Sequence, residues 1–205
     1  MEEKLQRSQS NYLTTEYLQS LYSDLKMPRN KIASLVKKGE LIPIRRGIYL
    51  HGAAYQRQYS KSVLAGLIYG PSAVSFEYAL SYHGLIPERV ETVTCICFKR
   101  NKEFETLVGN FSYRYIPKDL YPEGLEYHQT SLGNYFMASP EKALCDIVYF
   151  KKITSIDEAL SYLLESLRID RDELKNLSLE KLLLLERFYK RKSVVLIVDA
   201  VRSIM

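Results

Sequence analysis

The pattern of apolar and polar positions begins with two short helices. Apolar side chains recur at the spacing of one helix face between residues 13 and 22, and Thr14 or Thr15 can cap this helix. A second helix is predicted for Pro28–Lys38, because proline suits the first helical position and Gly39 can end the helix. The chain therefore starts with a helix-turn-helix pattern.

Two short apolar runs follow this pair of helices. Leu41–Arg45 and Gly47–Leu50 are predicted strands, with the turn between them at Arg46-Gly47, where glycine can take a positive φ. Two helices followed by a small hairpin are typical of a winged helix-turn-helix. We assign residues 1–55 to such a domain and expect residues 51–60 to be a linker or the start of the next helix.

The pattern of the remaining chain predicts an α+β domain over residues 56–205, with a mostly antiparallel sheet and a helical C-terminal tail. Helices are expected at 61–69, 76–82, 140–150, 156–167, 171–177, 179–189 and 194–204. Strands are expected at 92–98, 103–108, 111–116 and 135–138. The apolar run at 194–198 would also fit a buried strand.

Local signals refine this second domain. Ser75 and Ser139 are predicted to cap the helices that follow them. Thr92–Phe98 is apolar on both faces, which indicates a central strand. Gly109-Asn110 predicts the turn of a hairpin.

Charge changes the picture of the N-terminal domain. The segment from Lys26 to Arg46, 21 of the chain's 205 residues, holds seven basic side chains and one acidic side chain, Glu40. Its net charge of +6 exceeds the +5 of the whole chain, so the other 184 residues sum to −1. Positive charge confined to a helix and hairpin favours a DNA-binding surface over a general aid to solubility.

The predicted second helix has two distinct faces. Ile32, Leu35 and Val36 share an arc that should face the core, whereas Asn30 and Lys37 point outward. Asparagine can form two hydrogen bonds to adenine, and lysine or arginine can hold phosphates or bind guanine. We predict a DNA-binding set of Arg29, Asn30, Lys31, Ser34, Lys37, Lys38, Arg45 and Arg46. The alternative is that this basic face is simply solvated.

Bulk properties indicate a cytoplasmic protein. No apolar run approaches the length needed to span a membrane, and the polar start of the chain lacks a signal-peptide core. Cys95, Cys97 and Cys145 are too few and too irregular for a disulfide framework. We expect no membrane contact.

Candidate chemistry outside the basic segment is sparse. His83, Glu141 and Asp146 could form an enzyme site, but helix-end electrostatics account for the first two and a buried ion pair or hydrogen bond for Asp146. Cys95 and Cys97 favour core packing over metal binding, because no second pair of ligands follows. We expect no enzyme activity, no cofactor and no metal site.

Three stretches carry a family resemblance. They are Arg46-Gly47-Ile48-Tyr49, Ser75-Phe76-Glu77-Tyr78-Ala79-Leu80-Ser81-Tyr82-His83-Gly84-Leu85-Ile86-Pro87-Glu88 and Ala138-Ser139-Pro140-Glu141-Lys142-Ala143-Leu144-Cys145-Asp146. With these stretches in this order over residues 12–150, the chain resembles the AbiEi antitoxins. That family belongs to the type IV toxin–antitoxin systems of bacterial abortive infection, a defence against phage.

The resemblance implies a transcriptional autorepressor and antitoxin. Its winged helix would bind double-stranded DNA at inverted repeats in its own promoter, where two copies could associate. Its larger domain would counteract a nucleotidyltransferase-like toxin without forming a stable complex. Two alternatives stay open: a protein–protein adaptor that docks through its winged helix, and an enzyme with a site around His83, Glu141 and Asp146.

Overall fold

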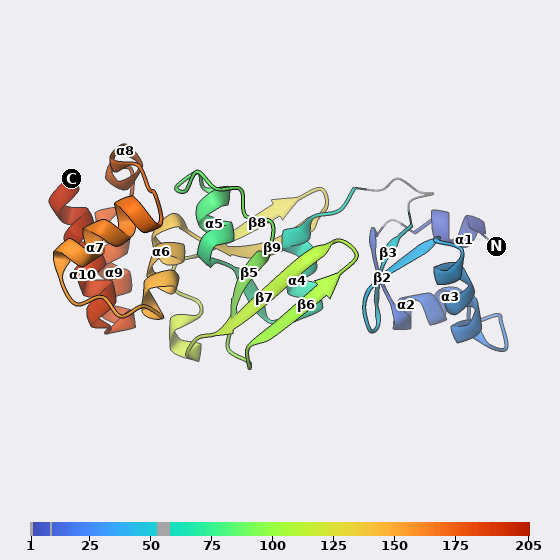
Figure 1. Cartoon of the computed structure of the whole chain (residues 1–205). Helices are drawn as coiled ribbons and strands as arrows, with labels where there is room; N and C mark the ends of the chain where they lie inside the picture. Colours follow the sequence, from blue (N-terminus) through green and yellow to red (C-terminus); the bar gives the residue numbers. More distant parts are fainter. Residues whose placement is uncertain (1, 9, 53–57) are drawn as a thin grey trace.

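The computed structural model describes residues 2–8, 10–52 and 58–205. Within these residues the fold is mixed α+β, with ten α-helices and mostly antiparallel strand pairing. Figure 1 shows an elongated molecule, with α2 and α3 at one end, a six-stranded sheet in the middle, and α7 to α10 at the other end. The predicted linker at 51–60 and the domain boundary at 55 involve residues 53–57, which lie outside the described part of the chain.

The N-terminal segment contains a small sheet and three helices. The elements are α1 (Glu2–Gln6), β1 (Tyr12–Thr14), α2 (Thr15–Leu21), α3 (Pro28–Lys37), β2 (Leu41–Arg45) and β3 (Ile48–His51). The strands pair antiparallel in the order β1-β3-β2. A separate hydrophobic cluster holds them together and consists of Leu5, Leu13, Leu18, Tyr22, Ile32, Leu35 and Leu41.

The predicted helices and hairpin of this segment are present with small changes. Thr14 is the N-cap of α2, and its side chain accepts a hydrogen bond from the backbone N–H of Tyr17 at 3.2 Å. The hairpin turns at Arg46-Gly47 as predicted, with Gly47 at φ 87°. Helix α1 and strand β1 were not predicted, and His51 belongs to β3 instead of a linker.

The large sheet has six strands in the order β6-β7-β5-β4-β9-β8. These are β4 (Ser72–Val74), β5 (Val93–Cys97), β6 (Lys102–Thr106), β7 (Gly109–Tyr115), β8 (Leu125–Thr130) and β9 (Gly133–Ala138). The pairs β5–β7 and β4–β9 are parallel, and the other three pairs are antiparallel. The prediction of a buried central strand at 92–98 is confirmed by β5, whereas β4 and β8 were not predicted.

The turn of the β6–β7 hairpin lies two residues before its predicted place. Thr106 pairs with Gly109, so Leu107-Val108 form the turn and Asn110 lies within β7. The Thr106 side chain donates to the Gly109 carbonyl at 2.7 Å and accepts from the Val108 N–H at 3.2 Å. These bonds close the turn, so the prediction at Gly109-Asn110 is wrong.

The remaining helices are α4 (Lys61–Ile68), α5 (Phe76–Tyr82), α6 (Pro140–Tyr149), α7 (Ile156–Ser161), α8 (Arg171–Lys175), α9 (Leu179–Tyr189) and α10 (Lys192–Ile204). A 3₁₀ turn spans Lys118–Leu120, and a π-helical turn follows α7 over Tyr162–Ser166, so the helix predicted at 156–167 is not uniform. Helix α10 excludes the alternative of a strand at 194–198, because its buried residues Val194, Ile197, Val198 and Val201 follow helical spacing.

The outer face of the small sheet packs against the larger part of the molecule. Ile44 and Leu50 belong to the same hydrophobic cluster as Leu64 and Ile68 of α4. The N–H of Ser60 donates to the hydroxyl of Tyr12 at 2.8 Å. The N-terminal segment is thus attached through side-chain packing. No described helix is both long and apolar enough to cross a membrane.

Candidate nucleic-acid interface

Helix α3 presents most of the predicted DNA-binding residues on its surface. It begins at Pro28 without a side-chain cap and buries Ile32 and Leu35. The outward residues Arg29, Asn30, Lys37 and Lys38 are exposed, whereas Lys31 and Ser34 are half-buried. The division of the helix into an apolar face and a basic face is as predicted.

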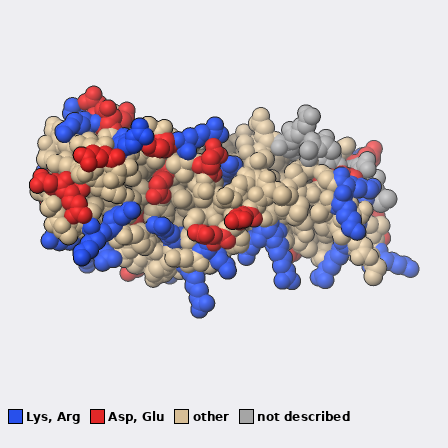
Figure 2. All heavy atoms as spheres, in the orientation of Figure 1, with Lys and Arg blue, Asp and Glu red and all other residues tan. Residues whose placement is uncertain are grey.

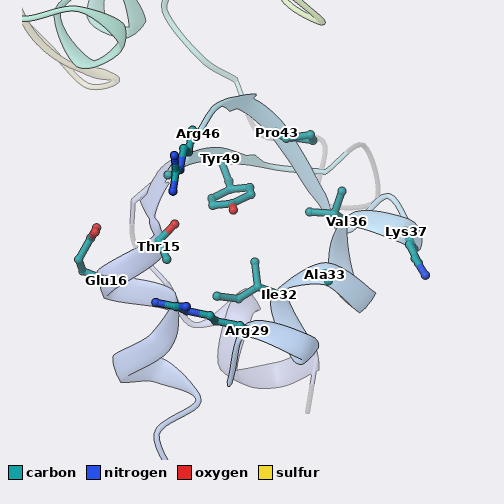
Figure 3. A pocket seen from close by; sticks show the side chains of 11 residues that line it. Thr15, Glu16, Arg29, Ile32, Ala33, Val36, Lys37, Pro43, Arg46 and Tyr49 are labelled. Atoms are coloured by element: carbon teal, nitrogen blue, oxygen red, sulfur yellow. The ribbon is translucent and has the colours of Figure 1, made fainter. Parts of the chain in front are cut away.

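An open groove lies between α3 and the β2–β3 hairpin, with a cavity volume of about 850 Å³. We call it the α3–hairpin groove; its lining consists of Thr15, Glu16, Arg29, Ile32, Ala33, Val36, Lys37, Pro43, Arg46, Gly47 and Tyr49. In Figure 3, Tyr49 of the hairpin faces Ile32 of α3 across this groove. The groove therefore has an apolar floor and a charged rim.

Arg29 and Lys37 of α3 and Arg46 of the hairpin turn all belong to this rim; in Figure 3 the two arginines lie on one side of the groove and Lys37 on the other, with its ammonium pointing outward. Glu16, at the start of α2, supplies the opposite charge on the same rim. Three cations and one acid leave a net positive groove, which favours an anionic partner.

The other predicted residues of α3 lie outside this groove lining. The amide nitrogen of Asn30 lies 3.3 Å from the Met27 sulfur. The ammonium of Lys31 lies 5.9 Å from the centre of the Tyr22 ring. Asn30 is thus exposed beside the N-terminus of α3, and Lys31 leans against the core.

Arg45 takes a different direction from its predicted one. Its guanidinium donates to the backbone carbonyl of Ile68 and lies 5.2 Å from the centre of the Phe104 ring. The register of β2 shifts between Pro43 and Arg45, and such a bulge breaks the alternation of side chains along a strand. Arg45 therefore contacts the larger part of the molecule and is absent from the groove lining.

Sequence reasoning missed Thr15, Glu16 and Tyr49 as members of this site. Tyr49 could have been found, because alternation along Ile48–Leu50 places it opposite its two apolar neighbours. Thr15 and Glu16 begin a helix whose orientation toward the hairpin depends on tertiary contacts. One such contact is the hydrogen bond from the Thr15 N–H to the Gly47 carbonyl, at 3.0 Å.

The positive surface continues beyond the N-terminal segment. Figure 2 shows lysine and arginine side chains projecting along the lower edge of the molecule, from the N-terminal segment to the six-stranded sheet. Next to Arg45, the rings of Phe104 and Tyr69 lie 5.9 Å apart, and the ammonium of Lys99 lies 5.4 Å from the Tyr69 ring centre. Lys99 is therefore connected to Arg45 indirectly, through these two rings, and its ammonium also donates to the Gly70 carbonyl.

His83, Glu141 and Asp146 all have structural partners. The Nε2 atom of His83 lies 2.9 Å from the Ala138 carbonyl. The buried Glu141 carboxylate accepts hydrogen bonds from the Ser178 N–H and the Ser139 hydroxyl, each at 2.9 Å. Its role is thus to join the start of α6 to the start of α9.

The fully buried Asp146 carboxylate forms the predicted ion pair, with Lys142 at 2.9 Å. It also accepts hydrogen bonds from the hydroxyls of Ser75 and Tyr189. Ser75 occupies the predicted N-cap position of α5, but its side chain caps no backbone N–H, because its hydroxyl donates to Asp146 instead. Burial raises the pKa of Tyr189 well above its ordinary value, which keeps its hydroxyl a donor.

The three cysteines are buried, as core packing requires. Burial raises the pKa of Cys95 and of Cys145, so both remain thiols at neutral pH. Across the described ranges, no group of three or more histidine, cysteine, aspartate or glutamate side chains is placed to hold a metal ion.

Comparison with known proteins gives a fold relationship alone. No protein-family model matches the chain, and no curated protein matches it significantly. Among solved structures, the RV2827C protein from Mycobacterium tuberculosis is similar, with a TM-score of 0.63 and 14% sequence identity. The similarity covers 97% of this chain and 75% of that protein, so nearly the whole arrangement of elements recurs in a second chain.

Proposed function

We propose that residues 1–55 form a winged helix-turn-helix that binds double-stranded DNA, and that the chain is a transcriptional autorepressor and antitoxin of the AbiEi kind. The observation that carries the proposal is the basic face of α3 beside an open groove, with Arg46 at the tip of the adjacent hairpin. A helix in the major groove and a hairpin beside it are the two contacts that a winged helix makes with a duplex.

Each exposed side chain has a distinct role in this proposal. Arg29, Lys37 and Arg46 bind backbone phosphates, because they surround one positively charged groove. Asn30 is exposed at the start of α3, where its amide can exchange the weak contact with the Met27 sulfur for an adenine edge.

The antitoxin role rests on the family resemblance of residues 75–88 and 138–146. In this proposal the larger domain counteracts a nucleotidyltransferase-like toxin without a stable complex. The hydrogen-bond and ion-pair partners of His83, Glu141 and Asp146 favour a structural function for these two segments. An enzyme site would instead need an accessible reactive group.

A protein–protein adaptor is the second candidate. The apolar floor formed by Ile32, Val36 and Tyr49 is the observation that favours it, since apolar grooves also bind protein segments. An adaptor would bind its partner through this floor with little dependence on salt, whereas phosphate contacts weaken steeply as salt rises.

A gel-shift titration tests the DNA-binding proposal. The probe is duplex DNA from the region upstream of the chain's own gene, at about 50 and about 200 mM salt. We expect affinity to fall steeply between these concentrations. Lys37→Ala should weaken binding to all sequences and reduce the slope of log affinity against log salt by about 0.9. Asn30→Ala should cost about 1–3 kcal/mol at one base position and relax sequence preference.

Lys175→Ala provides the matched control, because Lys175 is an exposed cation paired with Asp172 far from α3 in the fold. It should leave both affinity and slope unchanged. Binding that is insensitive to salt, or that falls equally in the control and in Lys37→Ala, would contradict the proposal. Salt-insensitive capture of a protein that is lost on Tyr49→Ala would favour the adaptor.

A further inference from the structure

A second positively charged groove lies where α6, α9 and α10 meet, at the opposite end of the molecule from α3 (Figure 1). It consists of two adjoining hollows of about 560 and 430 Å³ that share Tyr149. We call it the C-terminal cationic groove. Its basic residues are Lys151, Lys152, Arg187, Lys190, Arg191 and Lys192, and its lining includes one acid, Asp119.

Among the residues that the structure describes, these six cations gather in one groove without acidic partners. Within the described ranges none of them lies within 4.0 Å of a carboxylate, although other cations of the same helical tail do. Arg168, Lys175 and Arg202 pair with Glu88, Asp172 and Asp199, respectively. Unpaired like charges repel one another, so a groove that gathers six of them is suited to a polyanion.

Aromatic rings alternate with these charges. Phe150 and Phe188 are 43% and 39% exposed, respectively, which leaves part of each ring accessible to a ligand. The Phe150 ring also contacts Phe76, Tyr149 and the Arg114 guanidinium. The Arg191 guanidinium lies 4.8 Å from the centre of the Tyr149 ring. Nucleic-acid bases present flat faces to such rings only when they are unpaired, whereas a duplex hides them.

Lys190 adds an independent observation. It ends α9 in the left-handed conformation, with φ 48°, at a position where glycine is the usual residue. A lysine there is more strained than a glycine. Backbone geometry therefore gives no reason for a lysine at this position, whereas its charge contributes to the groove.

We propose that the C-terminal cationic groove binds an unpaired segment of nucleic acid, with phosphates held by the six cations and bases stacked on Phe150 and Phe188. The site is separate from the α3–hairpin groove and does not depend on the function proposed for it. A single-stranded ligand would engage the tail while α3 engages a duplex.

Fluorescence anisotropy of the full chain tests this proposal. The labelled probes are oligouridine RNA and oligothymidine DNA of about 12 nucleotides, and a duplex of the same length. We expect the unpaired probes to bind more tightly than the duplex through this groove. The double variant Lys152→Gln/Lys192→Gln should reduce the salt slope for the unpaired probes by about 1.4, since each phosphate contact in a single strand contributes about 0.7.

Two further variants separate binding from folding. Phe188→Leu should weaken binding of the unpaired probes by roughly fivefold or more without changing its salt dependence, because the substitution removes stacking alone. Lys190→Gly should weaken binding of the unpaired probes but leave the urea unfolding midpoint unchanged or higher, because glycine adopts the left-handed conformation without strain. The control is Lys175→Gln/Arg202→Gln, which removes two exposed cations that have acidic partners and should change little.

A preference for RNA or for DNA identifies the sugar, and either result supports the site. Three results would overturn it: no binding of unpaired probes, equal effects of the groove and control variants, or a duplex that binds with the same affinity and the same sensitivity to Phe188→Leu. Loss of operator binding in Lys37→Ala with the unpaired probes still bound would show that the two sites are independent.

Discussion

The buried pair of Lys142 and Asp146 is the most consequential feature at the residue scale. Both side chains are fully buried, and the ammonium also donates to the Leu120 carbonyl at 2.8 Å and to the Tyr189 hydroxyl at 2.5 Å. Two buried charges are tolerated only when each is paired and hydrogen-bonded, as these are. The network joins α5, α6 and α9 through polar contacts inside an apolar core.

Removing one member of this pair should be far more damaging than removing both. Asp146→Ala leaves the Lys142 ammonium buried without its counter-charge and should lower the free energy of unfolding by about 3–5 kcal/mol. Lys142→Met combined with Asp146→Leu removes both charges and should cost much less than the sum of the single changes.

Urea denaturation of the single and double variants gives the coupling energy through a double-mutant cycle. Additive effects of the two single substitutions would show that the ion pair carries no coupling and would contradict this account.

The sequence predicted a buried ion pair or hydrogen bond for Asp146, but it did not identify Ser75 and Tyr189 as hydrogen-bond partners. An acid inside the apolar helix at 140–150 required a buried counter-charge, and Lys142 lies one helical turn before Asp146. Tyr189 and Ser75 are 43 and 71 residues away along the chain, and no local pattern connects them to Asp146. For the same reason, the local capping signal placed Ser75 at the start of α5 but could not predict that its hydroxyl donates to Asp146.

At the element scale, N-cap residues decide where helices begin. The sequence left Thr14 and Thr15 as equal candidates for the N-cap of α2, and the structure assigns the cap to Thr14. Its side chain accepts a hydrogen bond from the Tyr17 N–H, one of the helix donors that have no partner within the helix. Ser139 performs the same role for α6.

The two neighbouring threonines therefore form a matched test. Thr14→Ala should lower the free energy of unfolding by about 1 kcal/mol, because it removes the cap. Thr15→Ala should cost less, because its hydroxyl is not the cap of α2. Urea denaturation of both variants measures the difference, and Thr14→Ser should restore the loss. Equal effects of the two alanine substitutions would contradict the assignment.

Long amphipathic helices were predictable, and three-residue strands were not. Helices α9 and α10 carry enough positions to show their period, although only the structure excluded a strand at 194–198. Strands β1 and β4 have three residues each, which are too few to show alternation. The shifted β6–β7 turn shows the same limit, because side-chain bonds of Thr106 outweighed the glycine signal.

At the scale of the whole molecule, the small sheet is shared by two hydrophobic clusters. Leu41 and Leu13 pack with α2 and α3, whereas Ile44 and Leu50 pack with the larger part of the chain. Arg45 adds a polar contact at the same junction through the Ile68 carbonyl. The sequence located the basic hairpin but could not predict this packing, because both faces of its strands are apolar.

Two adjacent arginines should therefore respond differently to substitution. Arg45→Ala should lower the free energy of unfolding by about 1–3 kcal/mol, because it leaves the Ile68 carbonyl without its charged donor. Arg46→Ala should leave stability unchanged and reduce the salt slope of duplex binding by about 0.9.

Thermal unfolding and the gel-shift titration together separate these two outcomes. If Arg45→Ala reduced the salt dependence of duplex binding as much as Arg46→Ala does, Arg45 would be a duplex contact as first predicted.

Ile44 and Leu50 belong to the same hydrophobic cluster as α4, which has a geometric consequence for the repressor proposed above. In that proposal the packing of the hairpin against the larger part of the chain favours one orientation of the N-terminal segment. Two copies on an inverted repeat would then lie at a separation set by the spacing of the half-sites. Inserting half a turn of B-DNA, about 5 base pairs, between the half-sites should then abolish cooperative occupancy, and a whole turn should restore it.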